Sequence, residues 1–307
     1  MEKLSDILII GAGPSGLTAG IYGARGGYKT TILTGSLAGG QLLYTSEIEN
    51  FPGFENPISG YDLMNRMINQ AKRLGVIMAD EQATAIDASK NPFQITAGEK
   101  IYYAKTIIIA TGASAKWLGL ESEKKFRGKG ISSCATCDGF FYKNKTVCVI
   151  GGGDTACEDA VFLTKFASKV YLIHRRDKFR ASYLAQKKVL SNPKIEVIYN
   201  HIPEDFIGDE KLKGIKIKNV NTGEMREIPV DGAFVAIGHH PNTKIFSNII
   251  KLDDQGYIIV DSNYETSAKG IFACGDVCDP KYKQAIAAAG IGCMAAMNAI
   301  KYLESLE

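Results

Sequence analysis

Short apolar runs separated by glycine-rich turns are the main pattern along this chain. Residues 6–10 form one such run, the glycine turn 11–16 follows, and residues 28–33, which end in Ile32 and Leu33, return as the next strand. Between them, residues 17–25 have the small and apolar positions of a helix that packs closely on a sheet. Apolar runs of this length, bounded by turn residues, predict buried parallel strands, so the whole stretch predicts a strand–turn–helix–strand unit.

A second unit of the same kind begins at residue 146. Its strand covers 146–150, its turn 151–156, its helix 157–166 and its returning strand 169–174. In such units the first glycine permits a tight turn, the second lets the backbone approach a pyrophosphate, and the third, or an alanine, lets the helix pack on the strand. The helix N-terminus then faces the anion. Two units predict two dinucleotide sites in one chain.

Two further apolar runs, 106–112 and 232–238, each end in glycine and are followed by polar or loop-forming residues. We interpret them as the joints between domains. The predicted fold is α/β, with two Rossmann-like, three-layer dinucleotide-binding domains, the second inserted into the first. The first domain covers 1–114 and 242–307, and the second covers 115–241. Residues 270–276 predict another strand and turn, and 284–306 a closing helix.

Composition narrows the class of protein. A chain of 307 residues, 45% hydrophobic and 22% charged, fits two globular domains of ordinary size. The net charge is only +3 and no long basic run appears, which argues against nucleic acid as a partner. No apolar run approaches the roughly 18 residues of a membrane span, and the N-terminus leads directly into a strand. We therefore expect a cytoplasmic protein without a membrane partner.

The stretch Cys134-Ala135-Thr136-Cys137 carries the clearest chemistry. A zinc site needs four ligands, and neither a second C-x-x-C nor a histidine pair exists, so no metal is expected. Two residues between cysteines bring the sulfurs within disulfide reach, and such motifs lower a thiol pKa, which favours exchange. Asp138 follows directly and is a candidate for proton transfer to or from a sulfur. A first-turn helix charge is a compatible role for it.

The other cysteines and the histidines carry weaker signals. Cys274 and Cys278 have C-x-x-x-C spacing, so a second redox pair stays open beside the favoured interpretation as core residues. Packing in the core is expected for Cys148, Cys157 and Cys293. Without a nucleophile at a recognisable spacing, loop positions are expected for His201, His239 and His240.

The two dinucleotide sites differ in their second strands. NAD sites often carry an acidic residue about 20 residues past the glycines. The second unit instead has His174-Arg175-Arg176, with Arg180 nearby, which suits a 2′-phosphate and predicts NADPH rather than NADH. The alternative is a solvated basic strand end. The first unit also lacks the acid, and flavin is inferred there from the dithiol, because NADPH delivers a two-electron hydride that flavin usually accepts.

Taken in order, these motifs resemble the bacterial-type, low-molecular-weight thioredoxin reductases, a group of pyridine nucleotide-disulfide oxidoreductases. The resemblance runs along essentially the whole chain. It is carried by Gly11–Gly16, Gly39-Gly40-Gln41, Glu49–Gly53, Ala110–Ala113, Cys134–Phe141, Gly151–Ala156, His174–Asp177 and Gly275-Asp276-Val277.

This resemblance implies FAD in the first domain, NADPH in the inserted one, a homodimer, and reduction of thioredoxin. Hydride would pass from NADPH to FAD and then to the Cys134–Cys137 disulfide, followed by dithiol–disulfide exchange with thioredoxin. By the same resemblance Cys137 faces the flavin, Cys134 attacks thioredoxin, and Phe140, Phe141 and Lys129 lie near the docking surface. Lys129 stands where an arginine is expected. The alternative is a flavin-dependent NADPH reductase that serves another thioredoxin-like or ferredoxin-type partner.

Motifs and resemblance together lead to two sets of expected cofactor contacts. For FAD they are Gly11, Gly13, Pro14, Ser15, Gly16, Thr34, Gly35, Gly39, Gly40, Gln41, Leu42, Asn50, Thr111, Gly112, Ala113, Gly275, Asp276, Gln284 and Ala285. For NADPH they are Gly151, Gly153, Asp154, Thr155, Ala156, Glu158, His174, Arg175, Arg176, Arg180, Ile237 and Gly238. Because the cysteine pair and the NADPH turn share the inserted domain, we expect a rotation about residues 111–114 and 238–241 that brings each in turn to the flavin.

Overall fold

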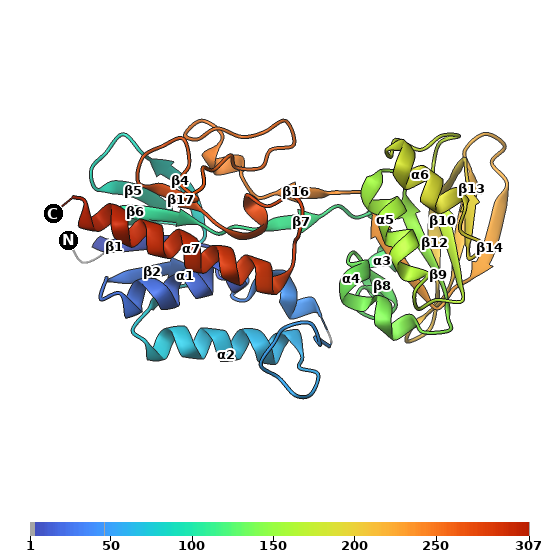
Figure 1. Ribbon diagram of the computed structural model, residues 1–307, viewed down its shortest axis with the longest axis horizontal. Coiled ribbons are helices and arrows are strands. Elements are labelled where there is room, and N and C mark those ends of the chain that lie inside the picture. Colours follow the sequence, from blue (N-terminus) through green and yellow to red (C-terminus); the bar gives the residue numbers. More distant parts are fainter. Residues whose placement is uncertain (1–3, 46, 307) are drawn as a thin grey trace. The chain divides into compact units, whose positions relative to one another are not determined.

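The computed structural model describes residues 4–45 and 47–306 of the chain. The chain folds into two compact units, called unit 1 and unit 2 below (Figure 1). Unit 1 consists of Met1–Ser114 and His240–Glu307, and unit 2 of Ala115–His239. Unit 2 is therefore an insertion into unit 1, and its second boundary follows His239, where the sequence placed it after Pro241.

Unit 1 is built on a seven-stranded sheet with the order β3-β2-β1-β6-β5-β4, in which β17 also pairs with β6. Its strands are β1 (Leu4–Ile10), β2 (Thr30–Leu33), β3 (Ile77–Ala79), β4 (Ala83–Asp87), β5 (Phe93–Ala97), β6 (Lys100–Ile109) and β17 (Ile271–Ala273). Strands β3, β2, β1, β6 and β17 are parallel, and β5 and β4 add an antiparallel hairpin at the edge. Ile7, Leu8 and Ile9 are fully buried because both faces of the sheet are covered, which explains the continuous apolar run.

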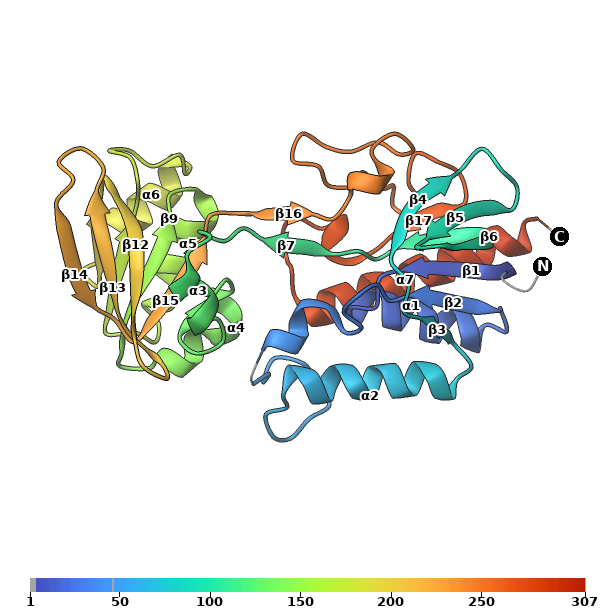
Figure 2. The same ribbon diagram turned by 180° about the vertical axis from the view of Figure 1, so that it is seen from behind.

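The helices of unit 1 lie against one face of this sheet (Figure 2). They are α1 (Pro14–Arg25), α2 (Gly60–Arg73) and α7 (Ala285–Glu304), and the 3-10 turns are η1 (Gly40–Tyr44), η3 (Lys244–Phe246) and η4 (Gly275–Val277). The other face packs against Phe246, Ile250 and Ile258 of the segment that follows unit 2. Helices α1 and α7 pack closely through small residues, since a Cβ at Gly292 of α7 would lie 2.2 Å from the Ser15 carbonyl oxygen of α1.

Helix α7 corrects one expectation from the sequence. In the described part of the chain it is one helix of 20 residues that is long and apolar enough to cross a membrane by length and composition alone. Its buried face consists largely of alanine and glycine, and Ala295, Ala296 and Ala299 pack with α1 and the sheet in the core of unit 1. A core helix passes the same test, so this finding is weak evidence for a membrane span.

Unit 2 has three layers: helices, a parallel sheet, and a second, antiparallel sheet (Figure 1). The parallel sheet has the order β11-β10-β9-β15-β8. Its strands are β8 (Ile131–Ser132), β9 (Thr146–Gly151), β10 (Lys169–Ile173), β11 (Ile195–Ile198) and β15 (Gly232–Ala236). The antiparallel sheet contains β12 (His201–Gly208), β13 (Leu212–Asn219) and β14 (Met225–Pro229). The helices are α3 (Glu121–Phe126), α4 (Ala135–Asp138), α5 (Asp154–Leu163) and α6 (Tyr183–Leu190), with the 3-10 turn η2 (Gly139–Tyr142).

The two connecting segments pair with each other as a small sheet of β7 (Ala113–Ala115) and β16 (His239–Pro241). The expectation that His239 and His240 are loop residues is therefore wrong, because mutual pairing satisfies the backbone of both connections. His201 is likewise the first residue of β12 rather than part of a loop. Beside the pair, the Asn242 amide donates to the carbonyl of Thr111 at 2.8 Å and the Thr111 hydroxyl donates to the carbonyl of Asn242 at 2.8 Å.

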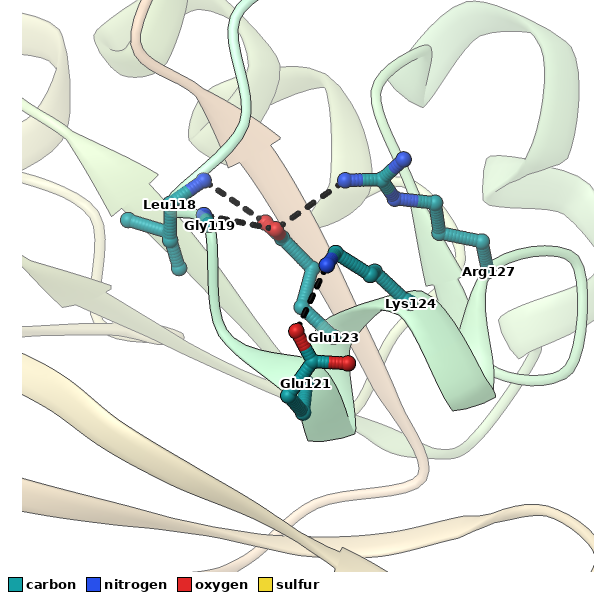
Figure 3. A network of polar contacts seen from close by, with 6 residues as sticks. All are labelled: Leu118, Gly119, Glu121, Glu123, Lys124 and Arg127. Atoms are coloured by element: carbon teal, nitrogen blue, oxygen red, sulfur yellow. Dashed lines mark hydrogen bonds and ion pairs between the residues drawn. The ribbon is translucent and has the colours of Figure 1, made fainter.

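A buried carboxylate holds the first segment of unit 2. Glu123 of α3 is fully buried and accepts hydrogen bonds from the backbone N–H of Leu118 at 2.9 Å and of Gly119 at 3.0 Å (Figure 3). It also forms an ion pair with Arg127 at 3.2 Å. The guanidinium of Arg127 lies 4.0 Å from the ring centre of Trp117. This network fixes residues 117–119 against α3, directly after the chain enters unit 2.

Candidate active site

Cys134 and Cys137 form a disulfide at the start of α4, with the sulfurs 2.03 Å apart. Cys134 is the N-cap of this short helix, and the helical turn brings Cys137 back beside it, with 5.3 Å between the Cα atoms. The backbone N–H of Cys134 donates to the hydroxyl of Ser132 at 3.0 Å, which fixes the approach to the turn. Both cysteines are half-buried, so the disulfide is accessible without lying open to solvent.

The hydrogen bonds around the disulfide favour Cys134. Its Sγ accepts the N–H of Cys137 at 3.2 Å and lies 3.4 Å from the Thr136 hydroxyl. Donors aimed at a sulfur stabilise its thiolate form once the disulfide is reduced. The local turn therefore prepares Cys134 to be the sulfur that carries negative charge.

Asp138 ends α4, directly after the second cysteine. Burial raises the pKa of its carboxyl above the ordinary value, and a hydrogen bond with Ser132 opposes that effect in part. Burial also raises the pKa of Tyr142 to about 12, with a contribution from the charge of Asp138. A carboxyl with a raised pKa beside a disulfide can hold a proton at higher pH than an exposed one, which suits proton exchange with a sulfur.

Aromatic side chains surround the turn that follows. Phe140 is 56% exposed, and its ring centre lies 6.2 Å from that of Phe141 and 6.0 Å from that of Phe166. Lys129, for which the resemblance implies a place near a docking surface, is exposed on the chain that leads into β8. An exposed aromatic group beside a reactive disulfide is a feature of surfaces that receive another protein.

The second glycine turn has the packing that a dinucleotide site needs. A Cβ at Gly151 would lie 2.4 Å from the Ala236 carbonyl oxygen and 2.6 Å from the Ala156 Cβ, so helix α5 packs directly on the strands. A Cβ at Gly153 would meet nothing within 4 Å, which leaves the backbone of the turn open. The turn therefore fits the backbone approach of a pyrophosphate at the N-terminus of α5.

The arginine stretch lies beside this turn. Arg175, Arg176 and Arg180 are exposed, and among the described residues no ion pair holds any of them. His174 is different, because it is only 5% exposed and its Nε2 lies 2.9 Å from the Lys178 carbonyl oxygen. Burial lowers its pKa, and hydrogen bonds to the backbone of Lys178 and Gly151 oppose that effect. The arginines face solvent, whereas the imidazole lies in the protein interior.

In the first glycine turn, in unit 1, the helix packs even more closely on the strands than in the second. Gly11 has φ +112°, and a Cβ there would lie 2.3 Å from the Ala110 carbonyl oxygen. A Cβ at Gly16 would lie 2.0 Å from the Gly11 carbonyl oxygen, so only glycine lets α1 start at this point. Around Gly13, in contrast, nothing lies within 4 Å of a Cβ. This is the open turn that a second dinucleotide needs.

Other segments of unit 1 meet at this turn. The Gly39 N–H donates to the Ala12 carbonyl at 3.0 Å, and the Gln41 amide donates to the Ala113 carbonyl. The Asn50 amide donates to Gln284 at 3.2 Å, at the N-cap of α7. A Cβ at Gly275 would lie 2.5 Å from the Ser15 hydroxyl oxygen. The structure thus brings residues 39 and 275 to the first turn, joins Gln41 to Ala113, and pairs Asn50 with Gln284.

Asp276, an expected FAD contact, has a perturbed pKa. Burial raises the pKa of its carboxyl to about 6, the charge of Asp279 adds to the shift, and Lys283 opposes it. The expected contact Thr34 is engaged inside the protein, where its hydroxyl donates to the Gly35 carbonyl at 3.0 Å and lies 3.3 Å from Asp80. Cys274 is fully buried and Cys278 half-buried, both are free, and burial raises the pKa of each thiol.

Of the remaining cysteines, two are core residues as predicted, and the third lies nearer the surface than predicted. Cys148 and Cys157 are buried core residues, whereas Cys293 is half-buried beside Met297 on α7. In the described residues, no group of three or more His, Cys, Asp or Glu side chains is arranged to hold a metal ion. Two residues, Ser132 beside the disulfide and Asn242 beside the connecting strands, were not predicted from the sequence. A serine two residues before the first cysteine is a local signal for the former, whereas the contacts of Asn242 span 131 residues.

Residues 5–292 match the pyridine nucleotide-disulphide oxidoreductases. The chain belongs to this family of enzymes. Membership gives it an oxidoreductase activity that uses a nicotinamide nucleotide and a flavin, and both open glycine turns fit such groups.

Within this family its branch is the bacterial-type, low-molecular-weight thioredoxin reductases. The chain is 48% identical to the thioredoxin reductase of Rickettsia conorii over 308 aligned positions, which cover 99% of both chains. The solved thioredoxin reductase from Giardia duodenalis is 41% identical, with a TM-score of 0.94 over 98% of this chain and 99% of that one. For the enzyme from Streptococcus pyogenes MGAS5005 the identity is 36% and the TM-score 0.95, over 99% of this chain and 100% of that one. These likenesses confirm the predicted fold class and the predicted activity.

Proposed function

We propose that this chain is an NADPH-dependent, FAD-containing reductase of thioredoxin disulfides. The observation that carries the proposal is the Cys134–Cys137 disulfide, which sits on α4 in the same unit as the second glycine turn. Bound to their turns, the flavin and the nicotinamide supply two-electron transfer to that disulfide. The rest of the chemistry belongs to the side chains of α4 and its neighbours.

The reduced pair is proposed to work by dithiol–disulfide exchange. The Cys134 thiolate attacks one sulfur of the partner disulfide, forms a mixed disulfide and releases the other partner sulfur as a thiolate. Cys137 then attacks Cys134, which reforms the internal disulfide and frees the reduced partner. The hydrogen bonds that reach Cys134 from Cys137 and Thr136 support this order, because they favour charge on Cys134.

Asp138 is proposed to supply and recover the proton in these steps. Its raised pKa supports the role, because a protonated carboxyl can donate to a departing sulfur and the carboxylate can later accept the proton of Cys137. The exposed Phe140, with Phe141 and Lys129, is proposed as part of the surface that receives thioredoxin. The apolar rings and the cation suit a partner with an apolar patch and acidic groups.

The nucleotide assignment rests on Arg175, Arg176 and Arg180, which are exposed and suited to a 2′-phosphate. The disulfide and this nucleotide turn belong to unit 2, whereas the flavin turn belongs to unit 1. We therefore propose that the units rotate about residues 111–114 and 238–241, so that each site reaches the flavin in turn. A crosslink that fixes the units should preserve one half-reaction and stop turnover, and full turnover in the crosslinked enzyme would refute the rotation.

The enzyme is also proposed to be a cytoplasmic homodimer that binds neither nucleic acid nor a membrane. Helices α1 and α7 support the dimer, because Tyr22, Met294 and Met297 are exposed on them as apolar groups. A net charge of +3 without a basic run supports the absence of nucleic acid.

The decisive experiment compares Cys134→Ser and Cys137→Ser with Cys293→Ser, which removes a half-buried thiol elsewhere. NADPH oxidation is measured with a panel of thioredoxins, glutaredoxins and ferredoxins, and repeated with NADH. Both α4 variants should lose disulfide reduction and keep flavin reduction by NADPH, whereas Cys293→Ser should behave as the wild type. Turnover by Cys137→Ser with a ferredoxin-type partner would instead support the alternative, a flavin-dependent NADPH reductase without a dithiol role.

A further inference from the structure

The loop that carries the three arginines is tied to the glycine turn of unit 2 at several points. Its residues, 174–182, connect β10 to α6. The Arg180 N–H donates to the Gly152 carbonyl at 2.8 Å. Two residues later, the Ser182 N–H donates to Asp154 Oδ1 at 2.8 Å. The loop is thus held at its end by the first residue of α5.

His174 holds the same loop from inside. Its ring lies over Gly152, where a Cβ would be only 2.1 Å from the imidazole, and it packs 5.4 Å from the ring of Phe179. The bond between its Nε2 and the Lys178 carbonyl closes the loop on itself. The imidazole therefore acts on the shape of the loop from a buried position.

Asp154 is the unusual member of these contacts. A carboxylate at the first turn of α5 stands beside the place where the phosphates of a dinucleotide would lie, and it repels them. Hydrogen bonds from the N–H and the hydroxyl of Ser182 lower its pKa, so it remains charged. Its charge repels the phosphates of a bound nucleotide, whereas its position at the N-terminus of α5 and its contacts with Ser182 are favourable. Of these two favourable roles, only the contacts with Ser182 reach the arginine loop.

We propose that Asp154 is a positioning residue that latches the arginine loop and thereby sets the selectivity for a 2′-phosphate. The inference rests on the proposed NADPH site, and it moves Asp154 from a nucleotide contact to the support behind Arg180. Without the latch, the loop must be ordered when the 2′-phosphate binds, and that cost lowers affinity for this group only.

The test uses the whole enzyme and two probes that differ by one group: 2′,5′-ADP, which carries the 2′-phosphate, and 5′-AMP, which lacks it. Binding is measured by calorimetry on the oxidised enzyme, without turnover. Asp154→Ala should bind 2′,5′-ADP about tenfold more weakly, equivalent to about 1.4 kcal/mol, and leave 5′-AMP unchanged or slightly tighter. Asp154→Asn keeps an acceptor oxygen and should retain the preference for 2′,5′-ADP.

The other end of the latch supplies a matched pair. Ser182 has φ −58°, which proline also adopts, so Ser182→Pro removes the N–H without changing that angle. Ser182→Ala keeps the N–H and loses only the hydroxyl. The proline variant should copy Asp154→Ala, and the alanine variant should retain most of the preference. In the double variant with Arg180→Ala, the effect of Asp154→Ala should largely disappear, since one acts through the other.

The possible outcomes distinguish a failure of the NADPH assignment from a failure of the latch. A wild-type enzyme that binds both probes equally would overturn the NADPH assignment and the latch with it. A wild-type preference that Asp154→Ala retains in full would overturn the latch alone. An equal loss of both probes in Asp154→Ala would also overturn it, because that pattern marks a general defect of the turn.

Discussion

The ion pair between the buried Glu123 and the partly exposed Arg127 in unit 2 leads to a stability prediction with a worked magnitude. Glu123 accepts two backbone hydrogen bonds and pairs with Arg127, and its side chain is fully buried. Glu123→Gln removes the charge and turns an amide N–H₂ toward groups that are themselves donors. Breaking a fully buried pair costs about 3–5 kcal/mol, and because the Arg127 side chain is 35% exposed, a loss of about 3 kcal/mol is expected here. At a typical slope of about 2 kcal/mol per M, the urea midpoint of unit 2 should fall by about 1.5 M.

Trp117 makes the measurement local. It is the single tryptophan of the chain, and its ring lies under the Arg127 guanidinium. Its fluorescence during a urea titration reports the unfolding of unit 2 within the whole protein. The control is Glu121→Gln, which breaks the exposed pair with Lys124 on the same helix and should change stability by less than about 0.5 kcal/mol (Figure 3). Equal midpoints for the two variants, at unchanged slope, would refute the reasoning.

Three further predictions concern the site and the surface. Asp138→Asn should slow disulfide exchange by about 100-fold. Because folding raises the pKa of this acid, the neutral variant should also be more stable than the wild type at high pH. This gain is absent below about pH 4 and grows as pH rises toward the folded pKa, which urea midpoints measured across pH will test. Gly13→Ala should leave the stability of the apoprotein within about 0.5 kcal/mol yet weaken flavin retention, since the added Cβ meets no protein atom and enters the open turn. Flavin absorbance after gel filtration measures the retention. Full retention would contradict flavin binding at this turn. Met297→Glu should shift the enzyme from dimer to monomer in light scattering, and an unchanged mass would exclude this face as the interface.

The central strands of each unit were predictable because they are buried on both faces of their sheet. Strands β1 and β9 appear in the sequence as uninterrupted apolar runs for that reason. The first residues of the helices were harder to predict. Helix α1 begins at Pro14 rather than Leu17, because proline suits a first helical turn even where the following residues are poor helix formers. The antiparallel sheet of β12–β14 was not predicted, since charged residues interrupt its apolar positions and β14 is largely exposed.

The candidate site also has a part that was easy to predict from the sequence and a part that was not, and the difference follows from how each part is assembled. The disulfide and the arginine loop each come from one local stretch of unit 2, so the spacing of Cys134 and Cys137 was enough to predict the pair. The proposed flavin site instead draws on segments far apart in unit 1, and its expected contacts Asn50 and Gln284 meet across 234 residues. A local stretch can present side chains to a partner while the core behind it stays intact. This arrangement suits the unit that must exchange electrons with a second protein, whereas a site assembled from many segments suits a cofactor that stays in place.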